Sequence, residues 1–274
     1  MSKFLASKNA ALRDASSEGS STEHDRSTMN SELNAIGMKF PFWGIRAGHC
    51  RGSKVILFES RSRKPPSSWS FETCRRILYF HKQINHENIL PLQGVCRDKE
   101  GIIFHIYNAV QKGSLHNVLQ VCPYELNEDI KYTLSNDICK GVNYLHKQGL
   151  VHGFLDTWNC LLDSNWILKV ANWAQCAIMD MEKELNMVAM ERTELQGLSN
   201  HTEIKRNLFR HQDFFSNQVG EGMGLQKKHD LYSYAMILIE IFSRKLPYHD
   251  KADANGWPAV WKEVLNEKRM PSMH

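Results

Sequence analysis

The chain has 274 residues, a length that suits one large two-lobed domain or two small ones, and 42% of its residues are hydrophobic, which is ample material for a core. Its net charge of +4 is mild, with Lys and Arg scattered among acids, which argues against a nucleic-acid-binding face. Seven cysteines without C-x-x-C or zinc spacing indicate reduced thiols and no metal site, and no apolar run approaches the roughly 18 residues of a membrane span.

Residues 1–38 are rich in Ser, Thr, Asn and charged residues and carry few large apolar side chains. Such a segment buries too little apolar surface to offset the conformational entropy of the chain, so we expect a disordered arm. The Ser/Thr cluster at residues 16–22 leaves two interpretations open. It is either a phosphorylatable segment that switches charge or a plain flexible tail.

The pattern from residue 39 to about residue 108 predicts a small β-rich lobe with one helix. Residues 55–58 and 101–107 are short apolar runs with β-branched side chains and strand length. After a break at two consecutive prolines, residues 71–84 show apolar residues at roughly helical spacing. We expect the single helix of this lobe there.

Beyond Gly113 the sequence predicts helices. Apolar residues recur every three or four positions from Ile130 to Leu145, which is the mark of a helix packed along one face, and Gly149 punctuates its end. Residues 231–242 are apolar nearly all round, so we expect a helix buried in the centre of a lobe. Residues 257–268 predict one further helix.

The stretch LVHGFLDTWNCLLDSNWILKVANWA, residues 150–174, has the layout of a protein-kinase catalytic centre without its essential acids. A kinase needs an H-R-D-L-x-x-x-N loop whose Asp accepts the substrate hydroxyl proton, and a D-F-G whose Asp holds Mg²⁺ on the nucleotide phosphates. Phe154 stands in the register of the base and Asn172 in that of the metal-binding Asp. The predicted first strand places Phe58 where the phosphate-pairing Lys belongs. We therefore predict no catalytic residue in this chain.

The loop HGFLDTWNC resembles that of the kinase homology domain of receptor guanylate cyclases, which commonly reads HGNLKSSNC. Residues 108–119, 129–146 and 230–235 resemble further blocks of protein kinases. The resemblance implies an α+β, bilobal protein-kinase-like fold, with a β-rich lobe over about 39–108. It implies a mainly helical lobe over about 109–274 that lacks the C-terminal helices of the family.

By the same resemblance the chain is a pseudokinase, a regulatory or scaffolding element of intracellular signalling without phosphotransfer. In a receptor guanylate cyclase it would form part of the cytoplasmic region and relay receptor state to a cyclase domain. Its partners would be signalling proteins, with homodimerisation through the larger receptor, and no nucleic acid. Two alternatives stay open: a divergent, weakly active kinase, and an integrin-linked type of scaffolding pseudokinase, which HENILPLQGVC and KGSLHNVL also resemble.

The resemblance also assigns roles to single residues. His152 and Asp230 are expected to support the loop structurally, with Asp230 accepting backbone N–H bonds. Asn159 and Asn172 are the residual nucleotide or metal contacts, but two neutral amides suit hard divalent cations poorly. We therefore expect no metal and no required cofactor, with weak ATP binding left open. Asp156 stands where active loops usually carry Lys, and we expect it on the open side of the loop.

The loop region also contains three tryptophans, Trp158, Trp166 and Trp173. They would either stack on adenine or fill the space that phosphates and metal leave, and we favour core filling.

Overall fold

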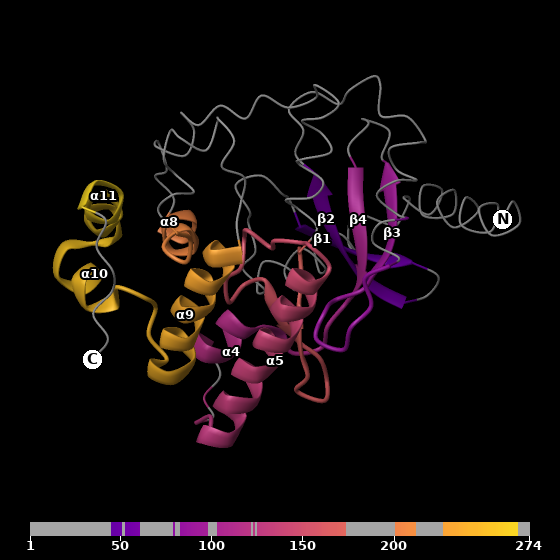
Figure 1. Cartoon of the computed structure of the whole chain (residues 1–274), viewed down its shortest axis with the longest axis horizontal. Coiled ribbons are helices and arrows are strands. Elements are labelled where there is room, and N and C mark those ends of the chain that lie inside the picture. Colours follow the sequence, from indigo (N-terminus) through magenta and orange to yellow (C-terminus); the bar gives the residue numbers. More distant parts are fainter. Residues whose placement is uncertain are drawn as a thin grey trace, which may run out of the picture. The chain divides into compact units, whose positions relative to one another are not determined.

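The computed structural model describes residues 45–50, 53–60, 79, 83–97, 103–121, 123, 125–173, 201–211 and 227–267. The chain divides into two compact units, of which the first comprises Met1–His86 and Leu90–Gln111 and the second Glu87–Ile89 and Lys112–His274. Figure 1 shows a sheet in the first unit and mainly helices in the second. The predicted α+β class with two lobes is confirmed. The predicted arm and nearly all of the predicted helix over residues 71–84 lie outside the described residues.

The first unit contains a four-stranded antiparallel sheet in the order β1-β2-β4-β3. Its strands are β1 (Ile45–Cys50), β2 (Ser53–Ser60), β3 (Leu92–Arg97) and β4 (Ile103–Asn108). The two predicted strands coincide with β2 and β4, which supply buried aliphatic side chains such as Val55 and Ile106. The sequence pattern did not indicate β1 and β3, because a glycine interrupts the apolar run of each.

The second unit begins with a two-residue strand, β5 (Gly113–Ser114), followed by the helices α4 (Leu115–Val121) and α5 (Glu128–Lys147). The side chain of Asn127 caps α5 by accepting a hydrogen bond from the Ile130 amide at 2.9 Å. Leu134, Ile138 and Leu145 form the buried stripe that the spacing predicted. Gly149 has a φ of 77°, and this left-handed conformation ends the helix where expected.

A short sheet in the order β5-β6-β7 lies beside α5 and contains β6 (Cys160–Leu162) and β7 (Leu168–Val170). Asn88 belongs to this unit, because its carbonyl oxygen accepts the Val170 amide at 2.8 Å and its side chain donates to the Leu168 carbonyl at 3.0 Å. A Cβ on Gly141 would come within 2.6 Å of the Asn88 oxygen. Glycine is therefore required where α5 passes this segment.

The helix α9 (Lys227–Ser243) corrects the prediction of a helix that is buried all round. Met236, Ile237 and Ile241 are buried, and the helix contacts α5. Leu231 is 59% exposed and Phe242 is 37% exposed. The prediction was wrong because apolar composition does not oblige a side chain to be buried.

Three further helices complete the described part of this unit: α8 (His201–Asn207), α10 (His249–Asn255) and α11 (Trp257–Glu267). The predicted helix over 257–268 is confirmed as α11, which packs against α8 and α10. The sequence pattern did not indicate α10, because HDKADAN has no apolar stripe. Within the described ranges, no helix combines the length and apolarity that crossing a bilayer requires.

Candidate functional site: a degenerate catalytic loop

Asp230, in the first turn of α9, holds the backbone of the loop that contains residues 152–160. Its Oδ2 accepts the His152 amide and its Oδ1 accepts the Gly153 amide, each at 2.8 Å. The Nε2 atom of His146, near the end of α5, also lies 2.8 Å from Oδ2. A fully buried carboxylate thus joins α9, α5 and the loop, in the structural role that the sequence analysis gave to Asp230.

His152 supports the same loop from inside. Its Nε2 lies 2.9 Å from the Ala171 carbonyl oxygen, and the Phe154 amide donates to its Nδ1 at 3.2 Å. Burial lowers the pKa of the His152 imidazole, which keeps the ring neutral. The neutral tautomer with its proton on Nε2 satisfies both contacts, so the geometry supports a structural role rather than proton shuttling.

The three residues that the sequence analysis placed in catalytic registers, Phe154, Asn172 and Phe58, carry no charged side chain. Phe154 is buried, and the Arg210 guanidinium lies 4.7 Å from the centre of its ring. Asn172 is also buried and has a φ of 59°, a left-handed conformation that Asn tolerates better than most residues. Phe58 lies in β2 of the first unit, where its backbone pairs with Ile45 and His105.

Asn159 ties the loop to the segment after β7. Its side-chain nitrogen donates to the Phe154 carbonyl oxygen at 2.6 Å, and its own carbonyl oxygen accepts the Ala171 amide at 2.8 Å. Its side-chain oxygen Oδ1 is buried and accepts no hydrogen bond. This orphaned oxygen is the one feature of the loop that suits a cation ligand.

The remaining donors do not fit a divalent cation. In the register of the metal-binding Asp the chain has the neutral amide of Asn172. Both carboxylate oxygens of Asp156 already accept hydrogen bonds from protein donors. Hard cations such as Mg²⁺ take carboxylate oxygens by preference. Among the described residues, no group of three or more His, Cys, Asp and Glu side chains is placed to hold a metal ion.

Asp156 does not lie on the open side of the loop, and that prediction was wrong. The residue is 1% exposed, and its Oδ2 accepts hydrogen bonds from Arg206 Nε at 3.0 Å and Nη2 at 2.9 Å. Its Oδ1 accepts the Asn159 amide at 2.8 Å. Arg206 comes from α8, 50 residues further along the chain, so no local pattern could reveal the partner. One indication of the ion pair was present in the sequence, namely an acidic residue at the loop position where active kinases usually have Lys.

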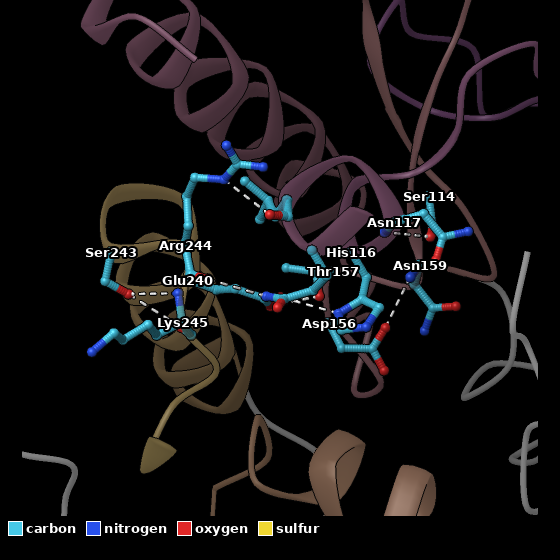
Figure 2. A network of polar contacts seen from close by, with 12 residues as sticks. Ser114, His116, Asn117, Asp156, Thr157, Asn159, Glu240, Ser243, Arg244 and Lys245 are labelled. Atoms are coloured by element: carbon cyan, nitrogen blue, oxygen red, sulfur yellow. Dashed lines mark hydrogen bonds and ion pairs between the residues drawn. The ribbon is translucent and has the colours of Figure 1, made fainter. Parts of the chain in front are cut away.

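A second buried carboxylate, Glu240 of α9, was also missed. Its Oε2 accepts the Thr157 hydroxyl at 2.8 Å, and its Oε1 lies 3.0 Å from His116 Nδ1 and accepts from Gln120 Nε2 at 2.9 Å. Figure 2 shows Glu240 reaching from α9 toward His116 and Thr157. An acid within the apolar run LYSYAMILIEIF was the available signal, because such a charge requires partners when it is buried.

The three tryptophans do not form one cluster. Trp158 and Trp173 are buried, and Trp158 stacks on the His116 ring with 3.8 Å between centroids. Trp166 is 36% exposed in the turn between β6 and β7, with the Lys112 ammonium 4.6 Å from its ring centre. Core filling therefore describes the first two and is wrong for Trp166.

Comparison with known proteins agrees with the loop pattern. A family model of protein tyrosine and serine/threonine kinases matches residues 67–274. Guanylate cyclase 32E of Drosophila melanogaster is 32% identical over 203 residues, which cover 73% of this chain and 16% of that protein. The speract receptor of Strongylocentrotus purpuratus is 27% identical over 177 residues, 64% of this chain and 15% of the receptor. Atrial natriuretic peptide receptor 2 of Rattus norvegicus is 26% identical over 228 residues, 81% of this chain and 19% of the receptor.

The chain spans less than a fifth of the length of each of these relatives. What they share with it is therefore a kinase-like region, and the relatives include the receptor guanylate cyclases that the HGFLDTWNC loop resembles. The family match covers well over half of the 274 residues. The chain belongs to the family of protein tyrosine and serine/threonine kinases.

Proposed function

We propose that this chain is a catalytically inactive kinase-homology module that acts as a regulatory or scaffolding element in intracellular signalling. The observation that carries the proposal is the presence of Phe154 where an active kinase has its catalytic Asp. Phe154 occupies the register of the catalytic base in a loop whose backbone is still held by Asp230 and His152. The scaffold that positions a base has been kept while the base itself has been replaced by a buried aromatic ring.

The other registers support the same interpretation. Phosphoryl transfer depends on positioning and on charges around the phosphates, and the base, the metal-binding Asp and the Lys supply most of these. Phe154, Asn172 and Phe58 replace all three. Asp156 is the nearest carboxylate in the loop sequence, but its pairing with Arg206 leaves it unavailable as a substitute base.

The relatives favour a place within a receptor guanylate cyclase, as part of its cytoplasmic region. There the module would relay receptor state through contacts with other domains and through receptor dimerisation. A scaffold of the integrin-linked type is the second candidate, favoured by the similarity of KGSLHNVL. The sequence of the transcript that encodes the chain distinguishes the two candidates. Only the receptor proposal requires that the same polypeptide contain a membrane span and a cyclase domain.

Purified protein is expected to transfer no phosphate from γ-labelled ATP to itself or to generic protein substrates. The reason is the loss of three charged groups that a compensating mechanism would have to replace separately. The measurement is radiolabel incorporation over hours. Incorporation that disappears in a folded Asn159→Ala variant would support the alternative of a weakly active kinase.

Any ATP binding is expected to be weak and independent of Mg²⁺, because no carboxylate stands in the register that bridges the metal to the phosphates. A ligand at 100 times its dissociation constant stabilises a protein by about 2.7 kcal/mol, so thermal-shift titration with ATP has the necessary range. Wild type should respond equally with Mg²⁺ and with EDTA. The matched variant Asn172→Asp restores one carboxylate and should introduce a difference. A clear Mg²⁺-dependent shift in wild type would contradict the expectation.

A further inference from the structure

Three alternate residues of the loop each contact the last turn of α8 or its extension. The Asp156 carboxylate binds Arg206 through two N–H donors. The Trp158 ring meets the Phe209 ring edge-on at 5.9 Å between centroids, and the Phe154 ring lies under the Arg210 guanidinium. The three contacts together join the loop to the segment 206–210.

The segment 206–210 is a continuous structural element. The Phe209 amide donates to the Arg206 carbonyl and the Arg210 amide to the Asn207 carbonyl, at 3.2 and 3.0 Å, so helical turns extend α8 to residue 210. Arg210 also donates to the side chain of Asn207. The Arg206 guanidinium contacts two side chains of the loop. It binds the Asp156 carboxylate and lies 5.4 Å from the centre of the Trp158 ring.

Two of the three loop positions are places where active kinases keep charged side chains, the base at 154 and a Lys at 156. In this chain the side chains at both positions are buried and bind groups from the segment 206–210. A substrate hydroxyl therefore has no open approach to residue 154. The surface used for chemistry in an active enzyme has become a docking face for the chain's own helix.

The position of α8 depends on such docking. At seven residues it is far below the length at which an isolated helix is stable in water. The helix also packs against α11, with the Lys205 ammonium 5.0 Å from the Trp257 ring centre. Beyond its end, the His211 ring meets the Tyr232 ring of α9 at 5.3 Å between centroids. A buried pair of opposite charges is directional, so Asp156 and Arg206 fix one placement of the helix on the loop.

We propose that the Asp156–Arg206 pair is an intramolecular latch that holds residues 201–211 against the catalytic-loop face and keeps that face closed. When the pair is removed, this segment opens as a local unit while the rest of the helical unit stays folded. The inference does not depend on the proposed lack of activity, because opening of the segment and phosphate transfer are measured separately.

Hydrogen–deuterium exchange of the whole chain tests the latch. The informative variant is Asp156→Asn with Arg206→Met. It removes both charges of the pair, so neither partner is left buried without its counter-charge. Asn at 156 keeps an acceptor for the Asn159 amide, and Met at 206 keeps an apolar stem against Trp158. Amides of residues 203–211 should exchange about 10- to 100-fold faster than in wild type, while those of residues 134–145 in α5 should change less than about twofold.

Lys205→Met is the matched control on the same helix, because Lys205 contacts Trp257 rather than the loop. It should leave exchange of residues 154–160 unchanged, whereas the double variant should accelerate it. Unchanged exchange of residues 203–211 in the double variant would overturn the latch. So would equal acceleration throughout α5 and α9, or failure of the double variant to fold, since each makes the pair a general support of the fold.

Discussion

Asp156→Ala is expected to lower the free energy of unfolding by about 3–5 kcal/mol. The substitution leaves the guanidinium of Arg206 buried without its carboxylate, and breaking one side of a buried ion pair has a cost of this order. It also removes the acceptor of the Asn159 amide. Replacing an aspartate on the open side of a loop would change the free energy of unfolding by only about 0.5 kcal/mol. A buried Asp156 and an exposed Asp156 therefore predict clearly different results.

Denaturant unfolding of four proteins gives the measurement: wild type, Asp156→Ala, Arg206→Met and the double variant, compared at equal slope. The double variant should be more stable than the sum of the single changes predicts, because it strands no charge. Asp129→Ala, an exposed acid in the first turn of α5, is the matched control and should cost well under about 1 kcal/mol. If the loss of unfolding free energy in the double variant equalled the sum of the losses in the two single variants, Asp156 and Arg206 would have no energetic coupling.

The sequence predicted well those features that depend on local pattern. The apolar stripe from Ile130 to Leu145 and the terminal glycine are both visible in the chain, and they predicted the helix that α5 (Glu128–Lys147) forms. The Asp230 contacts could be predicted because the start of α9 has its own recognisable block. That block, together with HGFLDTWNC, indicates which loop the carboxylate must reach.

The sequence failed where a side chain depends on a partner far along the chain. Asp156 and Arg206 are 50 residues apart, and Thr157 and Glu240 are 83 residues apart. Spacing does not show which of many charges will meet. The same limit explains Leu231, whose exposure depends on what covers α9 rather than on its own apolar character.

The loop makes two kinds of contact with the rest of its unit. Asp230, His152 and the Asn159 side chain keep the backbone contacts that hold the loop. Phe154 and Asp156, in contrast, face groups from α8 and its extension. The two sets meet at Asp156, because its Oδ1 also accepts the Asn159 amide. A change at Asp156 should therefore affect both sets, whereas a change at Asp230 leaves the Asp156–Arg206 pair intact.

The remaining large effect is expected for Asp230→Ala, at roughly 2–6 kcal/mol. The change strands the buried amides of His152 and Gly153, and each stranded donor costs about 1–3 kcal/mol. The His146 side chain loses its partner as well. Gly153 adopts a φ of 72°, so this loop conformation is held by the carboxylate in a region that only glycine enters readily.

Asp230→Asn is the matched variant, because it keeps the size of the side chain and one acceptor oxygen. It should cost about half as much as Asp230→Ala, since one of the two loop amides then faces an NH₂ group instead of an acceptor. Denaturant unfolding at equal slope compares both with the exposed control Asp129→Ala. If Asp230→Ala unfolded at the same denaturant concentration as that control, the two loop amides would not depend on Asp230. The anchoring of the loop on α9 would then have to be rejected.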